Sequence, residues 1–88
     1  MKLKYNFAIQ NICGFWAAVP VGRDVMKYSN TMSLNETAKD MMELLKEEIT
    51  EDELVAKMLE QYDATEEQMR ADVKAFIEKL REAEALSE

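Results

Sequence analysis

The residue types that most often transfer protons, attack as nucleophiles or bind metals are scarce in this chain. It has no histidine, and Cys13 is its single cysteine. Without histidine there is no proton shuttle suited to neutral pH and no imidazole to activate Cys13, and one cysteine cannot build a zinc site. We therefore expect no enzymatic activity, no cofactor and no bound metal. We expect Cys13 to pack as a small buried or half-buried apolar residue.

Carboxylates are the one plentiful reactive group, with 18 Asp and Glu among 88 residues. They cluster at residues 47–48, 51–53 and 66–67, where the pattern described below predicts loops and helix starts. Negative charge is stabilised at the N-terminal end of a helix by the helix dipole, so these clusters need no catalytic explanation. The glycines are Gly14 and Gly22, which excludes a glycine-rich phosphate loop.

Charge is distributed unevenly along the chain. Residues 1–35 have four basic residues against one acidic residue, whereas residues 36–88 have seven against seventeen, which gives the net charge of −7. An acidic protein repels phosphate backbones, so we expect no nucleic-acid partner. The basic first third leaves room for an acidic partner.

Length and hydropathy limit the organisation of the chain. Its 88 residues fit one domain over 1–88, with no room for a second core. No run approaches the ~18 apolar residues of a membrane helix, and the Met1–Lys4 start lacks the apolar stretch of a signal peptide. We therefore expect a cytoplasmic protein that does not contact a membrane.

The first third of the chain alternates in the manner of β-strands. Gly14 suits a turn, Pro20 suits a strand end or edge, and residues 21–24 suit a second turn. The predicted strands lie near residues 7–12, 15–20 and 26–34.

From residue 35 onward apolar residues recur every three or four positions, which is typical of amphipathic helices. Ser33 or Asn35 can cap the first helix, and Thr50 and Thr65 each begin a capping box. The predicted helices lie near residues 36–46, 51–62 and 66–84. Strands followed by helices predict an α+β domain, in which a three-stranded antiparallel sheet precedes three helices with a helix-turn-helix corner.

Two sets of side chains have both a structural and a functional interpretation. Methionines on the helical stripes favour the core, whereas Met26 and Met32 on the third strand suit either the core or a surface that adapts to varied peptides. On the last helix, Ile77 and a basic flank lie opposite a flank of Asp72, Ala75 and Lys79. The basic flank is either a solvated face with Glu66–Arg70 and Lys74–Glu78 pairs, or a contact for an acidic peptide.

A series of short motifs, behind a strand-rich segment ending in Val19-Pro20-Val21-Gly22, resembles one known family. The motifs are Leu34-Asn35-Glu36-Thr37-Ala38, Met41-Met42-Glu43-Leu44-Leu45, Tyr62-Asp63, and Asp72-Val73 with Phe76 and Leu80. In this order they resemble the PqqD-like family of the coenzyme PQQ biosynthesis protein D, from about Phe7 to Leu86. The chain differs from the family at two element ends, with Lys46-Glu47-Glu48 where members often have Gly and Glu84-Ala85-Leu86 where members commonly have Gly-Leu-Leu.

The resemblance implies a winged-helix peptide chaperone. Such a protein adds the leader of a ribosomally made precursor peptide to the edge of its third strand, against the last helix, and presents it to a modifying enzyme, usually a radical SAM enzyme. Transferred to this sequence, the peptide-binding residues are expected to be Met26, Tyr28, Thr31, Met32, Arg70, Lys74, Ile77 and Arg81.

Two alternatives remain open from the sequence. A helix-turn-helix corner also suits a DNA-binding winged-helix regulator, although the last helix, with four basic and six acidic residues over 66–84, offers few phosphate contacts. The chain could instead be a protein-interaction or dimerisation module. An open strand edge can pair with its own copy, so a homodimer is one of the expected states.

Overall fold

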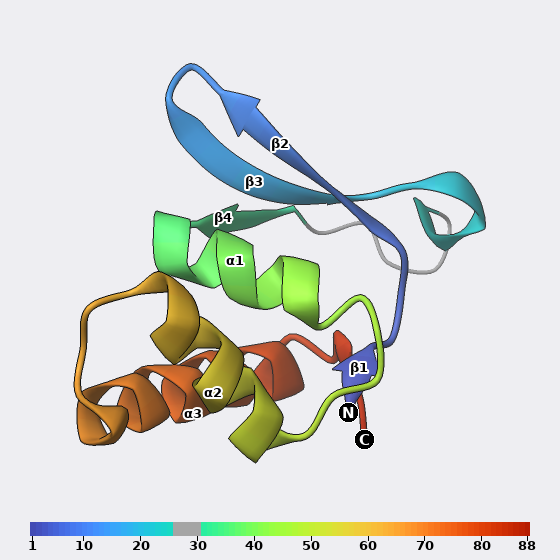
Figure 1. Ribbon diagram of the computed structural model, residues 1–88. Helices are drawn as coiled ribbons and strands as arrows, with labels where there is room; N and C mark the ends of the chain where they lie inside the picture. The colour runs from blue at the N-terminus through green and yellow to red at the C-terminus, as the bar shows by residue number, and fades with distance from the viewer. Residues whose placement is uncertain (26–30) are drawn as a thin grey trace.

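The main sheet and the helices form two halves of the chain in the order that the sequence predicts. The computed structural model describes residues 1–25 and 31–88. Its main sheet is antiparallel, with strand order β2–β3–β4. The strands are β2 (Phe7–Ile12), β3 (Phe15–Pro20) and β4 (Met32–Leu34), and the helices are α1 (Glu36–Leu44), α2 (Glu51–Gln61) and α3 (Glu66–Glu82). The sheet lies over α1, and α2 and α3 lie on the other side of α1 (Figure 1). The predicted α+β fold class is confirmed.

A two-residue turn joins β2 to β3. Ile12 pairs with Phe15, so Cys13 and Gly14 alone make the turn, with φ of 53° and 87°. Positive φ at both positions matches the right-handed twist of a hairpin, and the second position is glycine, which adopts it without steric cost. The side chain of Asn11 accepts a hydrogen bond of 3.0 Å from the Gly14 N–H. Cys13 is exposed at this tip, so its expected burial was wrong.

The third strand of the sheet is shorter in the described residues than the predicted 26–34. A 3₁₀ turn occupies Gly22–Val25, residues 26–30 lie outside the described residues, and β4 covers Met32–Leu34. Its register against β3 pairs Leu34 with Trp16 and Met32 with Ala18. Met32 is only 7% exposed, so its side chain belongs to the core, which decides between its two sequence interpretations.

The helix starts agree with the sequence to the residue. Asn35, rather than Ser33, caps α1, since its side chain accepts a 2.7 Å hydrogen bond from the Ala38 N–H. Thr50 and Thr65 form the two predicted capping boxes. The helix ends come one or two residues earlier than predicted, because the residues that follow α1, α2 and α3 act as C-caps rather than helical residues.

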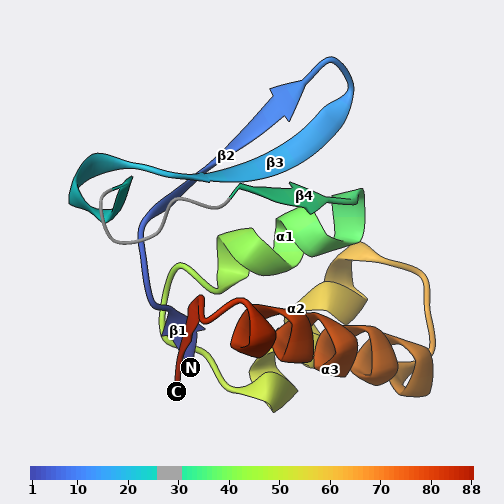
Figure 2. The same ribbon diagram turned by 180° about the vertical axis from the view of Figure 1, so that it is seen from behind.

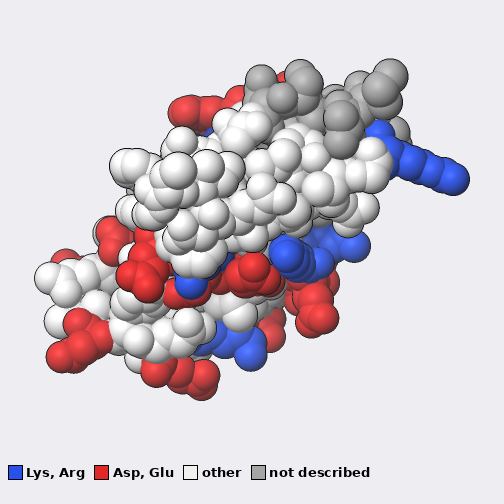
Figure 3. Space-filling model, turned by 90° about the horizontal axis from the view of Figure 1, so that it is seen from above, with Lys and Arg blue, Asp and Glu red and all other residues white. Residues whose placement is uncertain are grey.

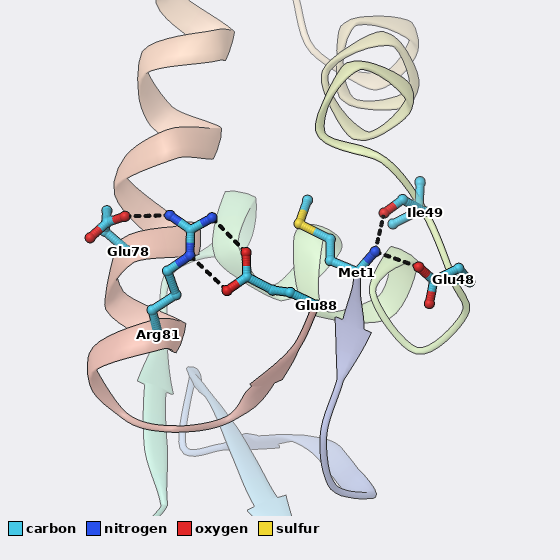
Figure 4. Close-up of polar contacts among 6 residues, drawn as sticks. All are labelled: Met1, Glu48, Ile49, Glu78, Arg81 and Glu88. Atoms are coloured by element: carbon cyan, nitrogen blue, oxygen red, sulfur yellow. Dashed lines mark hydrogen bonds and ion pairs between the residues drawn. The ribbon is translucent and has the colours of Figure 1, made fainter.

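A second sheet, which the sequence analysis did not predict, joins the two ends of the chain. β1 (Lys2–Leu3) pairs antiparallel with β5 (Leu86–Ser87), and the Leu3 N–H donates to the Leu45 carbonyl at 2.9 Å. The Met1 ammonium donates to the Glu48 carboxylate at 2.5 Å and to the Ile49 carbonyl at 3.1 Å (Figure 4). Two-residue strands are too short to produce a periodic signal, which explains why they escaped prediction.

The core extends through all the layers of the molecule. One cluster of buried apolar residues runs from Leu3 and Phe7 through the helices to Ala85. The four helical methionines, Met41, Met42, Met58 and Met69, are at most 2% exposed, as the stripes predict. Within the described residues, no helix combines the length and the apolar character needed to cross a bilayer.

Candidate functional site

A groove of about 320 Å³ separates the end of β4 and the first turns of α1 from one side of α3. It is the feature in which the edge of the sheet and the last helix come together. In Figure 2, α3 lies in front at the bottom, with β4 above it. The groove is lined by Ser33, Asn35, Thr37, Ala38, Met41, Asp72, Ala75, Phe76 and Lys79.

The upper wall of the groove is an open strand edge. Among the described residues β4 pairs with β3 alone, so its other edge has backbone N–H and C=O groups without a strand partner. Ser33 is exposed and lines the groove, and Thr31, directly before β4, is also exposed. Unpaired groups of this kind are a template for another strand, whose main-chain donors and acceptors would complete the ladder.

The lower wall is a single stripe along α3. Asp72, Ala75, Phe76 and Lys79 follow one another at i, i+3, i+4 and i+7, so they share one face of the helix. Phe76 gives this wall an apolar surface, and the small Ala75 leaves space beside it. Asp72 and Lys79 lie two turns apart, about 10 Å along the helix axis. The stripe therefore has a carboxylate at one end, an ammonium at the other and an apolar centre.

The basic flank of α3, whose residues the family resemblance offers as peptide contacts, does not line the groove. The Arg70 guanidinium donates to Asp52 at 2.8 Å, Glu66 at 3.0 Å and Glu51 at 3.3 Å, and thereby joins α3 to the start of α2. These hydrogen bonds, first those to Asp52 and Glu66, raise the pKa of Arg70. Ile77 is 2% exposed and belongs to the core, so it cannot provide an open apolar pocket.

Arg81 also has structural partners. Its guanidinium donates to Glu78 and, through two nitrogens, to both carboxylate oxygens of Glu88, at 2.6 and 3.0 Å (Figure 4). These hydrogen bonds, first that to Glu88, raise the pKa of Arg81. Lys74 is exposed on the same flank. Arg81 thus ties the end of α3 to the segment that follows β5.

None of the predicted site residues that the structure describes lines the groove. Met26 and Tyr28 lie outside the described residues, and none of the six described ones is among the groove-lining residues. Thr31 and Met32 belong to the β4 side by position, whereas the four α3 residues lie on other faces of the helix. The sequence contained the stripe of Asp72, Ala75 and Lys79 but no signal for which flank of α3 faces the sheet, because that depends on how α2 and β5 pack.

A polar chain holds the first half of α1 against its neighbours. The Tyr62 hydroxyl, at the end of α2, donates to the Asp40 carboxylate, and the Lys39 ammonium lies 2.9 Å from Asp40 and 4.7 Å from the centre of the Trp16 ring on β3. The hydrogen bond to Asp40 raises the pKa of Tyr62 to about 12. Partial burial opposes ionisation of Asp40, but the bonds from Tyr62 and Lys39 lower its pKa overall. These contacts position the α1 turn that lines the groove.

Two comparisons with known proteins agree with this fold. The family model of coenzyme PQQ synthesis protein D (PqqD) matches residues 21–86, which include β4 and all three α-helices. A solved structure described as TbiB1 in complex with the TbiA(beta) leader peptide superposes with a TM-score of 0.74 at 17% identity, covering 99% of this chain and 95% of that one. At this identity the likeness establishes a shared fold. No curated protein matches the sequence. Within the described residues, no group of three or more Cys, Asp or Glu is arranged to hold a metal ion.

Proposed function

This chain belongs to the coenzyme PQQ synthesis protein D family, and from that membership we propose that it binds the leader of a ribosomally made precursor peptide. The leader adds as an extended strand to the free edge of β4 and packs into the groove against α3. The chain performs no chemistry itself and presents the peptide to a modifying enzyme. The observation that carries the proposal is the open edge of β4 directly beside the α3 stripe.

In strand addition, the backbone and the side chains of the protein contribute differently to peptide binding. Main-chain hydrogen bonds to the β4 edge supply affinity for any extended segment, and the groove selects among sequences. Every second leader residue would point toward Phe76 and Ala75, which favours compact apolar side chains there. The fold shared with TbiB1, which was solved with a leader peptide, supports this use of the scaffold.

Charge at the two ends of the stripe would set the orientation of the leader. Lys79 favours an acidic residue and Asp72 a basic one, at positions about 10 Å apart. We expect the stronger preference to be for acidic residues, because residues 1–35 have a net charge of +3. A contact with Arg70, Lys74 or Arg81 stays a prediction, which the groove geometry does not favour.

The enzyme and the compartment follow from the same proposal. The family resemblance implies a radical SAM enzyme as the partner that modifies the core of the precursor. Precursor and chaperone would meet in the cytoplasm, where ribosomes release the peptide. A radical SAM gene and a short precursor gene beside the gene for this chain are the expected genomic context.

A pair of charge reversals on α3 tests the groove. Lys79→Glu and Lys74→Glu make the same change on two exposed residues of one helix, and only Lys79 lines the groove. Calorimetric titration with the leader of the neighbouring precursor should show about three- to fivefold weaker binding for Lys79→Glu, since exposed ion pairs contribute up to ~1 kcal/mol. Lys74→Glu should change the affinity less than about twofold.

The outcomes separate the groove from the function. A larger loss of affinity for Lys74→Glu than for Lys79→Glu would show that the basic flank contacts the peptide. Unchanged affinity in both variants would show that neither lysine contributes to peptide recognition. A wild-type chain that binds no leader from its own gene neighbourhood would contradict the proposed function itself.

A further inference from the structure

The β2–β3 hairpin is an uncharged projection on a highly charged protein. One third of all residues are charged, yet none lies between Tyr5 and Gly22. At the tip, Phe15 is 77% exposed and Ile12 is 51% exposed. The hairpin extends beyond the helices in Figure 1, and seen from above the sheet presents a broad face without charge in Figure 3. Large apolar side chains gathered at an exposed tip are typical of a contact surface rather than of a solvated turn.

The hairpin also has a free strand edge that lacks the usual protection. Among the described residues β2 pairs with β3 only, so Ala8–Ile12 form the edge of the sheet opposite β4. Proteins commonly block such edges with lysine, proline, inward charges or bulges. None of these occurs between Ala8 and Ile12, and every β2 residue is paired in an unbroken register with β3.

Charge identifies the partner that fits this edge. Two copies of a chain with a net charge of −7 repel one another over most of their surfaces, because the acidic residues are concentrated in residues 36–88. The hairpin is the part where two copies can approach without bringing like charges together. A two-fold contact also requires a surface that complements itself, and an uncharged antiparallel edge meets this requirement.

We propose that two copies of this chain form a dimer through their β2 edges, joining two three-stranded sheets into one continuous antiparallel sheet. Ala8, Gln10 and Ile12 alternate on the outer face of β2, on the same side as Phe15, so the exposed tip residues of each copy lie against β2 of the other. The two β4 edges then lie at opposite ends of the joined sheet. Each copy keeps an open groove, so the dimer can hold two extended peptides at once.

Sedimentation velocity on the full chain across micromolar to millimolar concentrations tests the dimer. A reductant is present throughout, so that the exposed Cys13 cannot cross-link two copies. The wild-type chain should show a concentration-dependent shift to twice the monomer mass. Gln10→Lys places a lysine on the pairing edge and should weaken the dimer at least about tenfold. Gln61→Lys makes the same change at an exposed position of α2 and should leave the dimer intact.

Hydrogen exchange identifies the edge that pairs. Alternate amides within Ala8–Ile12 should exchange more slowly in the dimer than in Gln10→Lys, whereas amides of β4 should exchange equally in both. A wild-type chain that stays monomeric at every concentration overturns the proposal and would indicate that the hairpin tip contacts a different protein. A dimer insensitive to Gln10→Lys, or one that protects β4, overturns it as well. Leader titration of the Gln10→Lys monomer tests peptide binding separately, so failure of the dimer and failure of the proposed function are distinguishable.

Discussion

At the scale of single residues, two arginines of α3 act as structural connectors. Arg70 and Arg81, which a sequence pattern suggests as peptide contacts, each hold two or more carboxylates at 2.5–3.3 Å. A partner peptide would have to compete with these internal carboxylates for the same guanidinium groups. Lys79 and Asp72 line the groove and have no ion pair within the described residues, which leaves their charges available.

The hydrogen bond from Tyr62 to Asp40 gives a prediction at this scale. Tyr62→Phe should lower the free energy of unfolding by about 0.5–1.5 kcal/mol at neutral pH, because it removes a partly buried donor to a carboxylate. The pKa of Tyr62 is raised from 10.0 to about 12, so its contribution is complete below pH 10 and is lost as pH rises through 12. The pKa of Asp40 is lowered from 3.8, so its contribution is present above pH 3.8 and is lost on further acidification.

Chemical denaturation of both proteins across this pH range measures the effect. The difference between wild type and Tyr62→Phe should be constant between about pH 5 and 9 and shrink at both extremes. A difference that does not vary with pH would mean that the hydroxyl packs without bonding the carboxylate.

At the scale of elements, the short strand β4 combines two requirements that conflict in most sheets. It must be buried on one face, where Met32 and Leu34 are each 7% exposed, and free along one edge. Alternation of side chains makes this possible, since Ser33 between them points away from the core. Within the described part of the chain its brevity also limits the exposed ladder to a few hydrogen bonds, which reduces the risk of unselective strand pairing.

A proline scan of the leader tests strand addition at this edge. Only every second residue of an added antiparallel or parallel strand donates its N–H to β4, and proline has no N–H to donate. Affinity should therefore fall at alternate leader positions, with a period of two, over the few residues that face β4. An alanine scan of the same positions serves as the control for lost side chains. A period near three or four would show that the leader binds as a helix instead.

At the scale of the whole molecule, the two ends of the chain help to close the core. The β1–β5 pair lies beside the loop between α1 and α2, and Figure 1 shows both termini at this place. Leu3 is 6% exposed and belongs to the core cluster, while its neighbour Lys2 is exposed. The small sheet therefore contributes buried apolar surface as well as backbone hydrogen bonds.

Truncation of the Leu3 side chain tests this contribution. Leu3→Ala should lower the free energy of unfolding by about 2–4 kcal/mol, the usual cost of removing a buried leucine side chain. Lys2→Ala should remain within about 0.5 kcal/mol of wild type, as is usual for exposed positions. Equal stability of the two variants, measured by urea denaturation, would show that the first residues fray and that the core ends at Phe7.

The sequence by itself determined the local features of this protein. The alternation of apolar residues over 7–20 and their helical spacing after residue 35 depend on neighbours a few positions apart. The caps at Thr50 and Thr65 likewise involve residues three positions apart. The absence of histidine led to the expectation of no enzymatic activity. Order and spacing of short motifs were enough to identify the family that the comparisons then established.

The tertiary structure alone decided which surfaces face one another. In the sequence, the two polar flanks of α3 border the same apolar stripe and are equivalent. The packing of α2 and β5 decides between them. It places Asp72 and Lys79 at the groove beside β4, whereas Arg70 and Arg81 bond to carboxylates elsewhere. The exposure of Cys13 and the pairing of β1 with β5 were also settled by contacts between residues far apart in the chain or by the geometry of a tight turn. The physical reason is that amphipathic periodicity specifies which side of an element is buried, but not which neighbour lies beside its flanks.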